Sequence, residues 1–222
     1  MSRGDIATVR IPELNDRDIR QALILKLRNE PTGPRGIIEE LWVHDGQAIA
    51  DVVALEDEAH CYEIKGCNDK VERILVQGTH YNACFRRITL VTTDRGLPKA
   101  LRVSPVFWGI IVAQIKDKEI RLHHVRLAKN NPNFTKQVAV LTLWKQEMLN
   151  LLKDPSHYRK PRETLARLIA ATKGKIELST HICEMLLGRQ RTQTLKRQDR
   201  NHVRNVRVDG RLHHGRRATV AA

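Results

Sequence analysis

Three charged residues interrupt two apolar stretches of the sequence. Asp51 lies within "AIADVVAL", and Glu63 and Lys65 flank Ile64 in "CYEIKG". Because side chains alternate along a strand, Glu63 and Lys65 should project from the same face of the second stretch. A short turn between the two strands would bring Asp51 to that face. Burying an isolated carboxylate is costly, so these charges must be paired, hydrated or bound to a metal.

Two carboxylates at one point predict a divalent cation between them, and Mg²⁺ or Mn²⁺ suits oxygen ligands of this kind. Such an ion would polarise a phosphodiester and lower the pKa of a bound water. Lys65 would orient that water or stabilise the developing negative charge. Gln77 and Tyr81, one helical turn apart, should face the site and contact backbone phosphates. A salt bridge between Glu63 and Lys65 and a solvent-facing helix pair are the alternative explanations.

The surrounding pattern predicts an α/β fold with a mixed β-sheet. Ile19, Leu23 and Leu27 recur at helical spacing before Pro31. The remaining predicted elements are strands at 36–43, 48–55 and 60–66, a helix from Asp69 to Phe85, a strand at 86–93, and a hairpin over 108–128. The order helix, three strands, helix, strand predicts an αβββαβ core with helices packed against the sheet.

The chain divides into three predicted regions. Residues 1–130 form the core, and residues 131–188 form a helical extension that packs on it. Within the extension we expect one continuous helix over 135–153, and a helical hairpin or a helix-turn-helix over 161–196. Residues 189–222 form a basic tail that is expected to be disordered and flexible or a loosely packed helix, because it has too few apolar residues to offset chain entropy.

The charge balance points to a polyanionic partner. The chain has 39 Lys and Arg against 25 Asp and Glu, a net charge of +14. Its last 34 residues hold ten Lys or Arg and two Asp, a net +8. This excess favours DNA bound through counterion release, with RNA left open, over a tail that only aids solubility. The candidate nucleic-acid contacts are Arg73, Gln77, Tyr81, Arg189, Arg191, Lys196 and Arg197.

Other features limit the class of protein. The sequence contains no stretch of 18 apolar residues, so it predicts no membrane span. The N-terminal residues lack the apolar core of a signal peptide. The four cysteines show neither zinc-like pairs nor a compact disulfide pattern, so we expect reduced thiols in a cytoplasmic protein. The oligomeric state stays open, a homodimer included.

The segments "AD", "YEIKG", "QGTHY" and "ITLV", in this order, resemble the PD-(D/E)xK, or restriction-endonuclease-like, nuclease superfamily and its RecB-like branch. From about residue 15 to 188 the chain is also similar to a bacterial and prophage family with a locus-style name. The resemblance implies catalytic roles for Asp51, Glu63, Lys65, Gln77 and Tyr81, and metal binding by Asp51, Glu63 and Glu40. The pattern is not kept at Ile49, where an arginine is expected, at 66–68, where Ser-Asp should follow the lysine, and at Arg86, where an acid is usual.

These observations predict a metal-dependent nuclease that hydrolyses DNA phosphodiester bonds, in the defence, recombination or repair functions of a prophage or mobile element. The alternative is a non-catalytic nucleic-acid-binding or assembly protein of such an element.

Some RecB-like nucleases carry an iron–sulfur cluster, whose four cysteines bracket the domain. Because three of the four cysteines here lie inside the core, we expect no iron–sulfur cluster.

Overall fold

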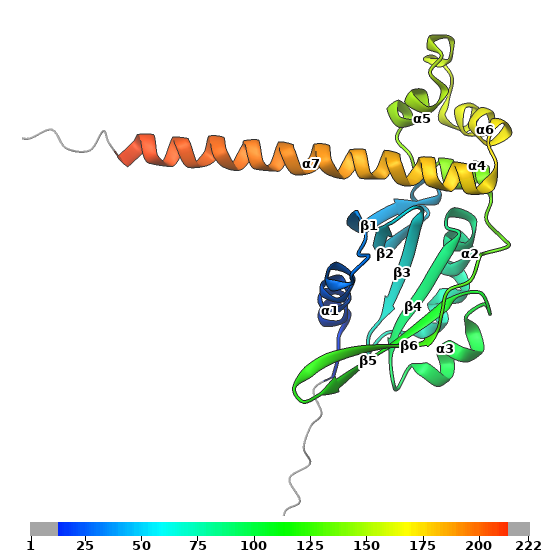
Figure 1. Ribbon diagram of the computed structural model, residues 1–222, viewed down its shortest axis with the longest axis vertical. Coiled ribbons are helices and arrows are strands. Elements are labelled where there is room, and N and C mark those ends of the chain that lie inside the picture. Colours follow the sequence, from blue (N-terminus) through cyan, green and yellow to red (C-terminus); the bar gives the residue numbers. More distant parts are fainter. Residues whose placement is uncertain (1–12, 213–222) are drawn as a thin grey trace, which may run out of the picture.

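A six-stranded mixed sheet forms the centre of the molecule (Figure 1). The structure, a computed structural model, describes residues 13–212, with side chains over 13–195. The strands are β1 (Gly36–Val43), β2 (Ala48–Leu55), β3 (Ala59–Lys65), β4 (Arg87–Thr93), β5 (Gly109–Lys116) and β6 (Glu119–Arg126). They lie side by side in chain order. The pairs β1–β2, β2–β3 and β5–β6 are antiparallel, whereas β3–β4 and β4–β5 are parallel.

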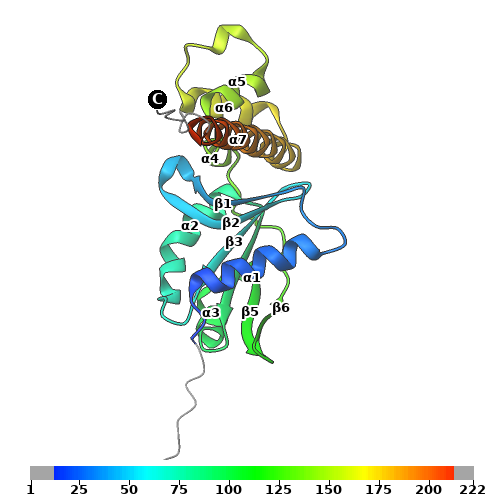
Figure 2. The same cartoon turned by 90° about the vertical axis from the view of Figure 1, so that its left-hand side faces the viewer.

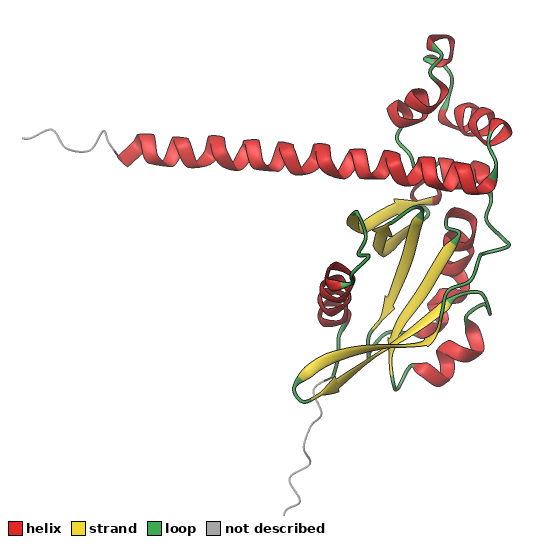
Figure 3. Ribbon diagram, in the orientation of Figure 1, coloured by secondary structure: helices red, strands yellow, loops and turns green. Residues whose placement is uncertain are grey.

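Helices cover both faces of this sheet (Figure 3). Helix α1 (Asp16–Asn29) buries Ile19, Leu23 and Leu27 on one face, as its spacing predicts. Helix α2 (Ile74–Cys84), which follows a 3₁₀ turn at Val71–Arg73, and α3 (Leu97–Val103) lie on the other. The predicted α/β class and mixed sheet are therefore confirmed, and the elements α1-β1-β2-β3-α2-β4 follow the predicted order. The short helix α3 was not among the predicted elements.

Four helices follow the sheet and gather beyond the end of it that carries the β1–β2 hairpin (Figure 2). They are α4 (Lys136–Val140), α5 (Lys145–Leu152), α6 (Arg162–Thr172) and α7 (Lys175–Leu212), with a 3₁₀ turn at Pro155–His157 between α5 and α6. The first turns of α7 pack on the core through buried Leu178, Ile182 and Leu186.

The prediction of one helix over 135–153 is wrong, because the helix is interrupted at 141–144. Two arginines bind the carbonyl oxygens that the interruption frees. Arg162 donates to the carbonyls of Leu141 and Leu143 at 2.6 and 3.0 Å. Arg189 donates to the carbonyl of Thr142 at 3.1 Å. Since unpaired backbone carbonyls are costly to bury, these long-range contacts stabilise the break.

Helix α7 does not end at Arg189, and the first part of the predicted tail is helical, the second of the two predicted alternatives. It continues to Leu212 and projects far from the core, on the side of the sheet that α1 covers (Figures 1 and 2). The segment contains no proline and many residues of good helix propensity, which permits this extension. The remainder of the predicted tail, 213–222, lies outside the described residues. Over residues 13–212, no helix combines the length and apolar composition needed to cross a bilayer.

Candidate active site

The three charged residues of the sequence motif line one cleft. Asp51 comes from β2, and Glu63 and Lys65 come from β3. The cleft has a volume of about 540 Å³ and also takes in Glu40 of β1 and Gln77 of α2. The structure therefore brings the predicted catalytic and metal-binding carboxylates to one opening.

The cleft opens where two neighbouring strands diverge. Strands β2 and β3 pair from Leu55 with Ala59, next to their connecting turn, to Val52 with Tyr62. The pairing ends at Val52 and Tyr62. Asp51 and Glu63 occupy the next position on each strand. The Oδ2 atom of Asp51 accepts a hydrogen bond of 2.7 Å from the backbone N–H of Ile64. The side chain of Asp51 thus takes the place of a backbone partner at the point of divergence.

Glu63 and Lys65 form a buried ion pair beside Asp51. Their side chains are 1% and 8% exposed, and Lys65 Nζ lies 2.5 Å from Glu63 Oε1. Lys65 also donates to Oε1 of Gln77 at 3.1 Å, which fixes its direction. The second oxygen of Glu63, Oε2, is buried and has no hydrogen-bond partner among the described residues. An unpartnered carboxylate oxygen in this position fits a bound cation.

The environment of Asp51 opposes its negative charge. Burial, and after it the nearby charge of Glu63, raise the pKa of the Asp51 carboxyl to about 7, against the lowering effect of the Ile64 N–H. Near neutral pH, a proton or a cation beside the carboxylate would offset this cost. The donor set of Asp51 and Glu63 therefore fits a hard divalent ion such as Mg²⁺ or Mn²⁺.

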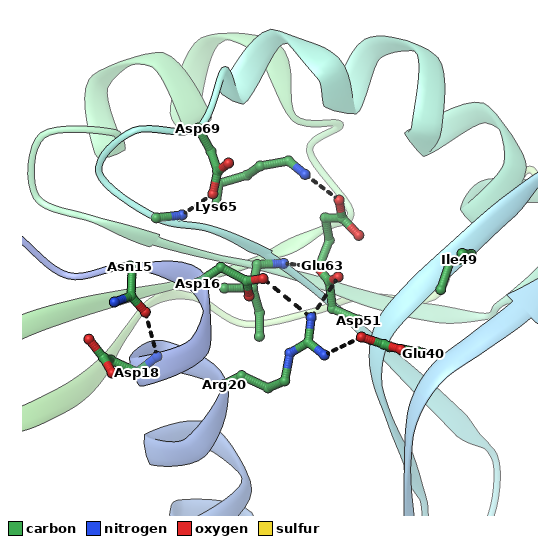
Figure 4. A network of polar contacts seen from close by, with 12 residues as sticks. Asn15, Asp16, Asp18, Arg20, Glu40, Ile49, Asp51, Glu63, Lys65 and Asp69 are labelled. Carbon is green, nitrogen blue, oxygen red and sulfur yellow. Dashed lines mark hydrogen bonds and ion pairs between the residues drawn. The ribbon is translucent and has the colours of Figure 1, made fainter.

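Arg20 of α1, which was not among the predicted site residues, lies among the carboxylates (Figure 4). It donates to Glu40 at 3.0 Å, and to Asp51 and Asp16 at 3.3 Å each. The spacing of four between Asp16 and Arg20 at the start of a predicted helix was the available sequence signal. The resemblance implies an arginine at position 49, which is Ile49 here; Arg20 supplies a guanidinium to the motif aspartate from another element.

Glu40 does not join Asp51 and Glu63 in a metal-binding cluster, contrary to the predicted set of three. Its side chain is 67% exposed and paired with Arg20. Over the part of the chain that the structure describes, no three His, Cys, Asp or Glu side chains form such a group. Glu40 lies at the rim, between the register pairs Glu39–Val52 and Leu41–Ala50 of β1 and β2, with a left-handed φ of 55°. Such a backbone is strained for a residue with a side chain and is a feature of functional sites.

The residues predicted on α2 divide into two kinds. Gln77 and Arg73 line the cleft, and Arg73 is exposed at the N-terminal end of the helix. Tyr81 is fully buried, and its hydroxyl donates to the carbonyl of Ile49 at 2.7 Å. Burial also raises the pKa of Tyr81, with a contribution from Glu63. Tyr81 therefore holds β2 beside the cleft, and its buried hydroxyl is not placed to contact a phosphate, contrary to the prediction.

The predicted contacts on α7 also differ from one another. Arg189 is 7% exposed and forms an ion pair with Glu147, so it fastens α7 to α5 and is not free to bind DNA, contrary to the prediction. Arg191 is exposed. Lys196 and Arg197 lie in α7, beyond the residues whose side chains are described.

Comparison with known proteins identifies one family. The profile of the family described as "Bacteriophage P4 protein cII" matches residues 11–208, which include the whole sheet, the cleft and most of α7. Comparisons with curated proteins and with solved structures found no match. Because the family match spans far more than half of the 222 residues, the chain belongs to the bacteriophage P4 protein cII family.

Proposed function

We propose that this member of a phage family is a metal-dependent nuclease that hydrolyses DNA phosphodiester bonds. The observation that carries the proposal is the buried Glu63–Lys65 pair, with the free Oε2 of Glu63 beside Asp51 in an open cleft. A buried carboxylate oxygen with no partner is costly for a purely structural ion pair. It is useful in a site that binds a cation.

Each side chain would have a distinct part in the reaction. Asp51 and Glu63 would hold Mg²⁺ or Mn²⁺, which, when bound, polarises the phosphodiester and acidifies water. Lys65, held by Glu63 and Gln77, would orient the attacking water and stabilise charge that develops on the phosphate. Arg73, exposed at the mouth of the cleft, would bind a neighbouring phosphate.

The resemblance to PD-(D/E)xK nucleases supports this assignment. The motif residues lie on the second and third strands of an α1-β1-β2-β3-α2-β4 arrangement, and Gln77 reaches Lys65 from the following helix. Defence, recombination and repair in a phage or other mobile element are the settings we propose for the activity.

One observation favours the non-catalytic alternative, a nucleic-acid-binding or assembly protein. Arg20 neutralises Asp51 and Glu40 without a metal. If Arg20 is a permanent counterion, the cleft needs no divalent ion, and only binding of nucleic acid remains.

A survey of substrates separates the two functions. The purified chain is incubated with single-stranded DNA, double-stranded DNA and RNA, each with Mg²⁺, Mn²⁺ or EDTA, and products are resolved by size. The nuclease proposal predicts cleavage of DNA with Mg²⁺ or Mn²⁺ and none with EDTA. Binding of the same substrates without cleavage under any metal condition would favour the alternative.

A further inference from the structure

A second hollow adjoins the cleft. It has a volume of about 590 Å³ and lies between the β1–β2 hairpin and helices α5, α6 and α7. Glu40, Trp42 and Gly46 line both the cleft and this hollow. A ligand that leaves the cleft past Glu40 therefore enters the hollow directly.

Two exposed tryptophans, Trp42 and Trp144, line this second hollow, which we call the tryptophan hollow. Trp42 is 62% exposed and Trp144 is 54% exposed, whereas the remaining tryptophan, Trp108, is fully buried. The guanidinium of Arg189 lies 4.2 Å from the centre of the Trp144 ring and is itself fixed by Glu147. Large apolar rings that are exposed together mark a binding surface. Exposed aromatic rings in a basic setting are the platforms on which unpaired nucleobases stack.

The lining of the tryptophan hollow carries charges of both signs. Asp45 and Glu40 are paired with Arg162 and Arg20 respectively, whereas Glu39 is exposed and forms no ion pair with the described residues. Lys145 adds a positive charge to the lining.

Helix α7 carries a series of basic residues away from the core. It borders the hollow at Arg189 and Gln193. From Gln193, basic residues recur along the sequence at 196, 200, 204, 207 and 211. Steps of three and four residues place these positions on one face of the helix. Helix α7 projects on the side of the sheet that α1 covers (Figure 2), so a strand that follows this face of the helix from Gln193 would leave the hollow on that side.

We propose that the tryptophan hollow binds single-stranded nucleic acid, with bases stacked on Trp42 and Trp144 and the phosphate backbone following α7. The inference deepens the proposed function, on which it rests for its purpose, because it specifies an unpaired strand as the substrate delivered to the cleft. A duplex is a poor ligand here, since its bases are already stacked on one another.

The buried position of Trp108 makes tryptophan fluorescence a direct test. The full-length chain is titrated in EDTA, which prevents metal-dependent hydrolysis, with a single-stranded oligonucleotide, an abasic strand of equal length and a duplex. We expect the single strand to quench the two exposed tryptophans and to bind more tightly than the other two. Trp42→Ala and Trp144→Ala should each weaken its binding by about 5- to 100-fold, the usual loss when one stacked base is released. The Phe variants should retain most of the affinity, and Val106→Ala, at another exposed apolar residue, should retain all of it.

Equal affinity for the abasic strand, or unchanged affinity of both Ala variants, would overturn the inference. So would a failure of any oligonucleotide to bind, which would leave the hollow to a protein partner. The result is separable from the proposed function. Stacking without cleavage in Mg²⁺ would leave the inference in place and remove the nuclease, whereas cleavage that neither Ala variant affects would do the reverse.

Discussion

Lys65 Nζ lies 2.5 Å from Oε1 of Glu63, and water has little access to either side chain. Breaking a buried ion pair by removing one partner leaves an uncompensated charge. We therefore expect Lys65→Ala to lower the free energy of unfolding in EDTA by about 3–5 kcal/mol. Denaturant unfolding followed by circular dichroism measures this loss.

The double variant Glu63→Gln, Lys65→Met is the control for this pair. It removes both charges while keeping similar volumes, so it should recover most of the stability that Lys65→Ala loses. If Lys65→Ala unfolds at the wild-type midpoint, the two residues are not the buried pair described above.

The raised pKa of Asp51 predicts a pH dependence of stability. The folded carboxyl takes up its proton at about pH 7, and the unfolded one at its ordinary value of 3.8. Between these values the folded state binds more protons, so the contribution of Asp51 to stability falls as pH rises and levels off above pH 7. Denaturant unfolding in EDTA across this range should show a decline in wild type that is smaller in Asp51→Asn. The same pH slope in both proteins would contradict the prediction.

Arg20 tests whether the carboxylates form a cation site. Arg20→Gln removes the counterion of Asp16, Glu40 and Asp51. In EDTA it should lower the free energy of unfolding by about 2 kcal/mol, because hydrogen bonds to charged groups are lost. Mg²⁺ should then raise the melting temperature of Arg20→Gln more than that of wild type.

Lys26→Gln is the matched control for Arg20, since Lys26 lies on the same helix and pairs with Glu30 away from the cleft. It should respond to Mg²⁺ as wild type does. An equal Mg²⁺ response in all three proteins would contradict competition between Arg20 and a cation for these carboxylates, and no response in any of them would indicate that the carboxylates bind no divalent ion.

Two arginines of α7 should behave differently. Arg189→Ala loses the pair with Glu147 and the bond to Thr142, so it should destabilise the fold by about 3 kcal/mol. Arg191→Ala, at an exposed position, should leave stability unchanged. It should weaken binding of DNA at every sequence and lower the slope of log affinity against log salt by about 1. Loss of stability in Arg191→Ala, or none in Arg189→Ala, would reverse these two roles.

The sequence predicts the sheet well because each strand is a local apolar run and residues that favour turns separate one run from the next. It also brings Asp51, Glu63 and Lys65 together, since strand alternation and one short turn suffice. It does not predict Arg20 at the site, because the contact with Asp51 joins residues 31 apart on different elements. The break at 141–144 likewise depends on Arg162 and Arg189, which only the folded chain brings to those carbonyls.

The left-handed backbone of Glu40 had no signal in the sequence. A glycine or an asparagine is the usual residue in such a conformation, and a glutamate in a β-strand pattern predicts extended backbone. The rim of the cleft is therefore shaped by a strain that pairing in the surrounding sheet sustains.

The central claim is that Asp51, Glu63 and Lys65 form one hydrolytic centre. The most direct test is the rate of DNA cleavage in Mg²⁺ or Mn²⁺ by wild type and by Asp51→Asn, purified in parallel, with Asp94→Asn as a control carboxylate outside the cleft. The account predicts metal-dependent cleavage by wild type and Asp94→Asn, and a loss of at least about 100-fold in Asp51→Asn, as expected when a metal ligand is removed. Equal cleavage by wild type and a folded Asp51→Asn, or no cleavage by wild type with either metal, would contradict it.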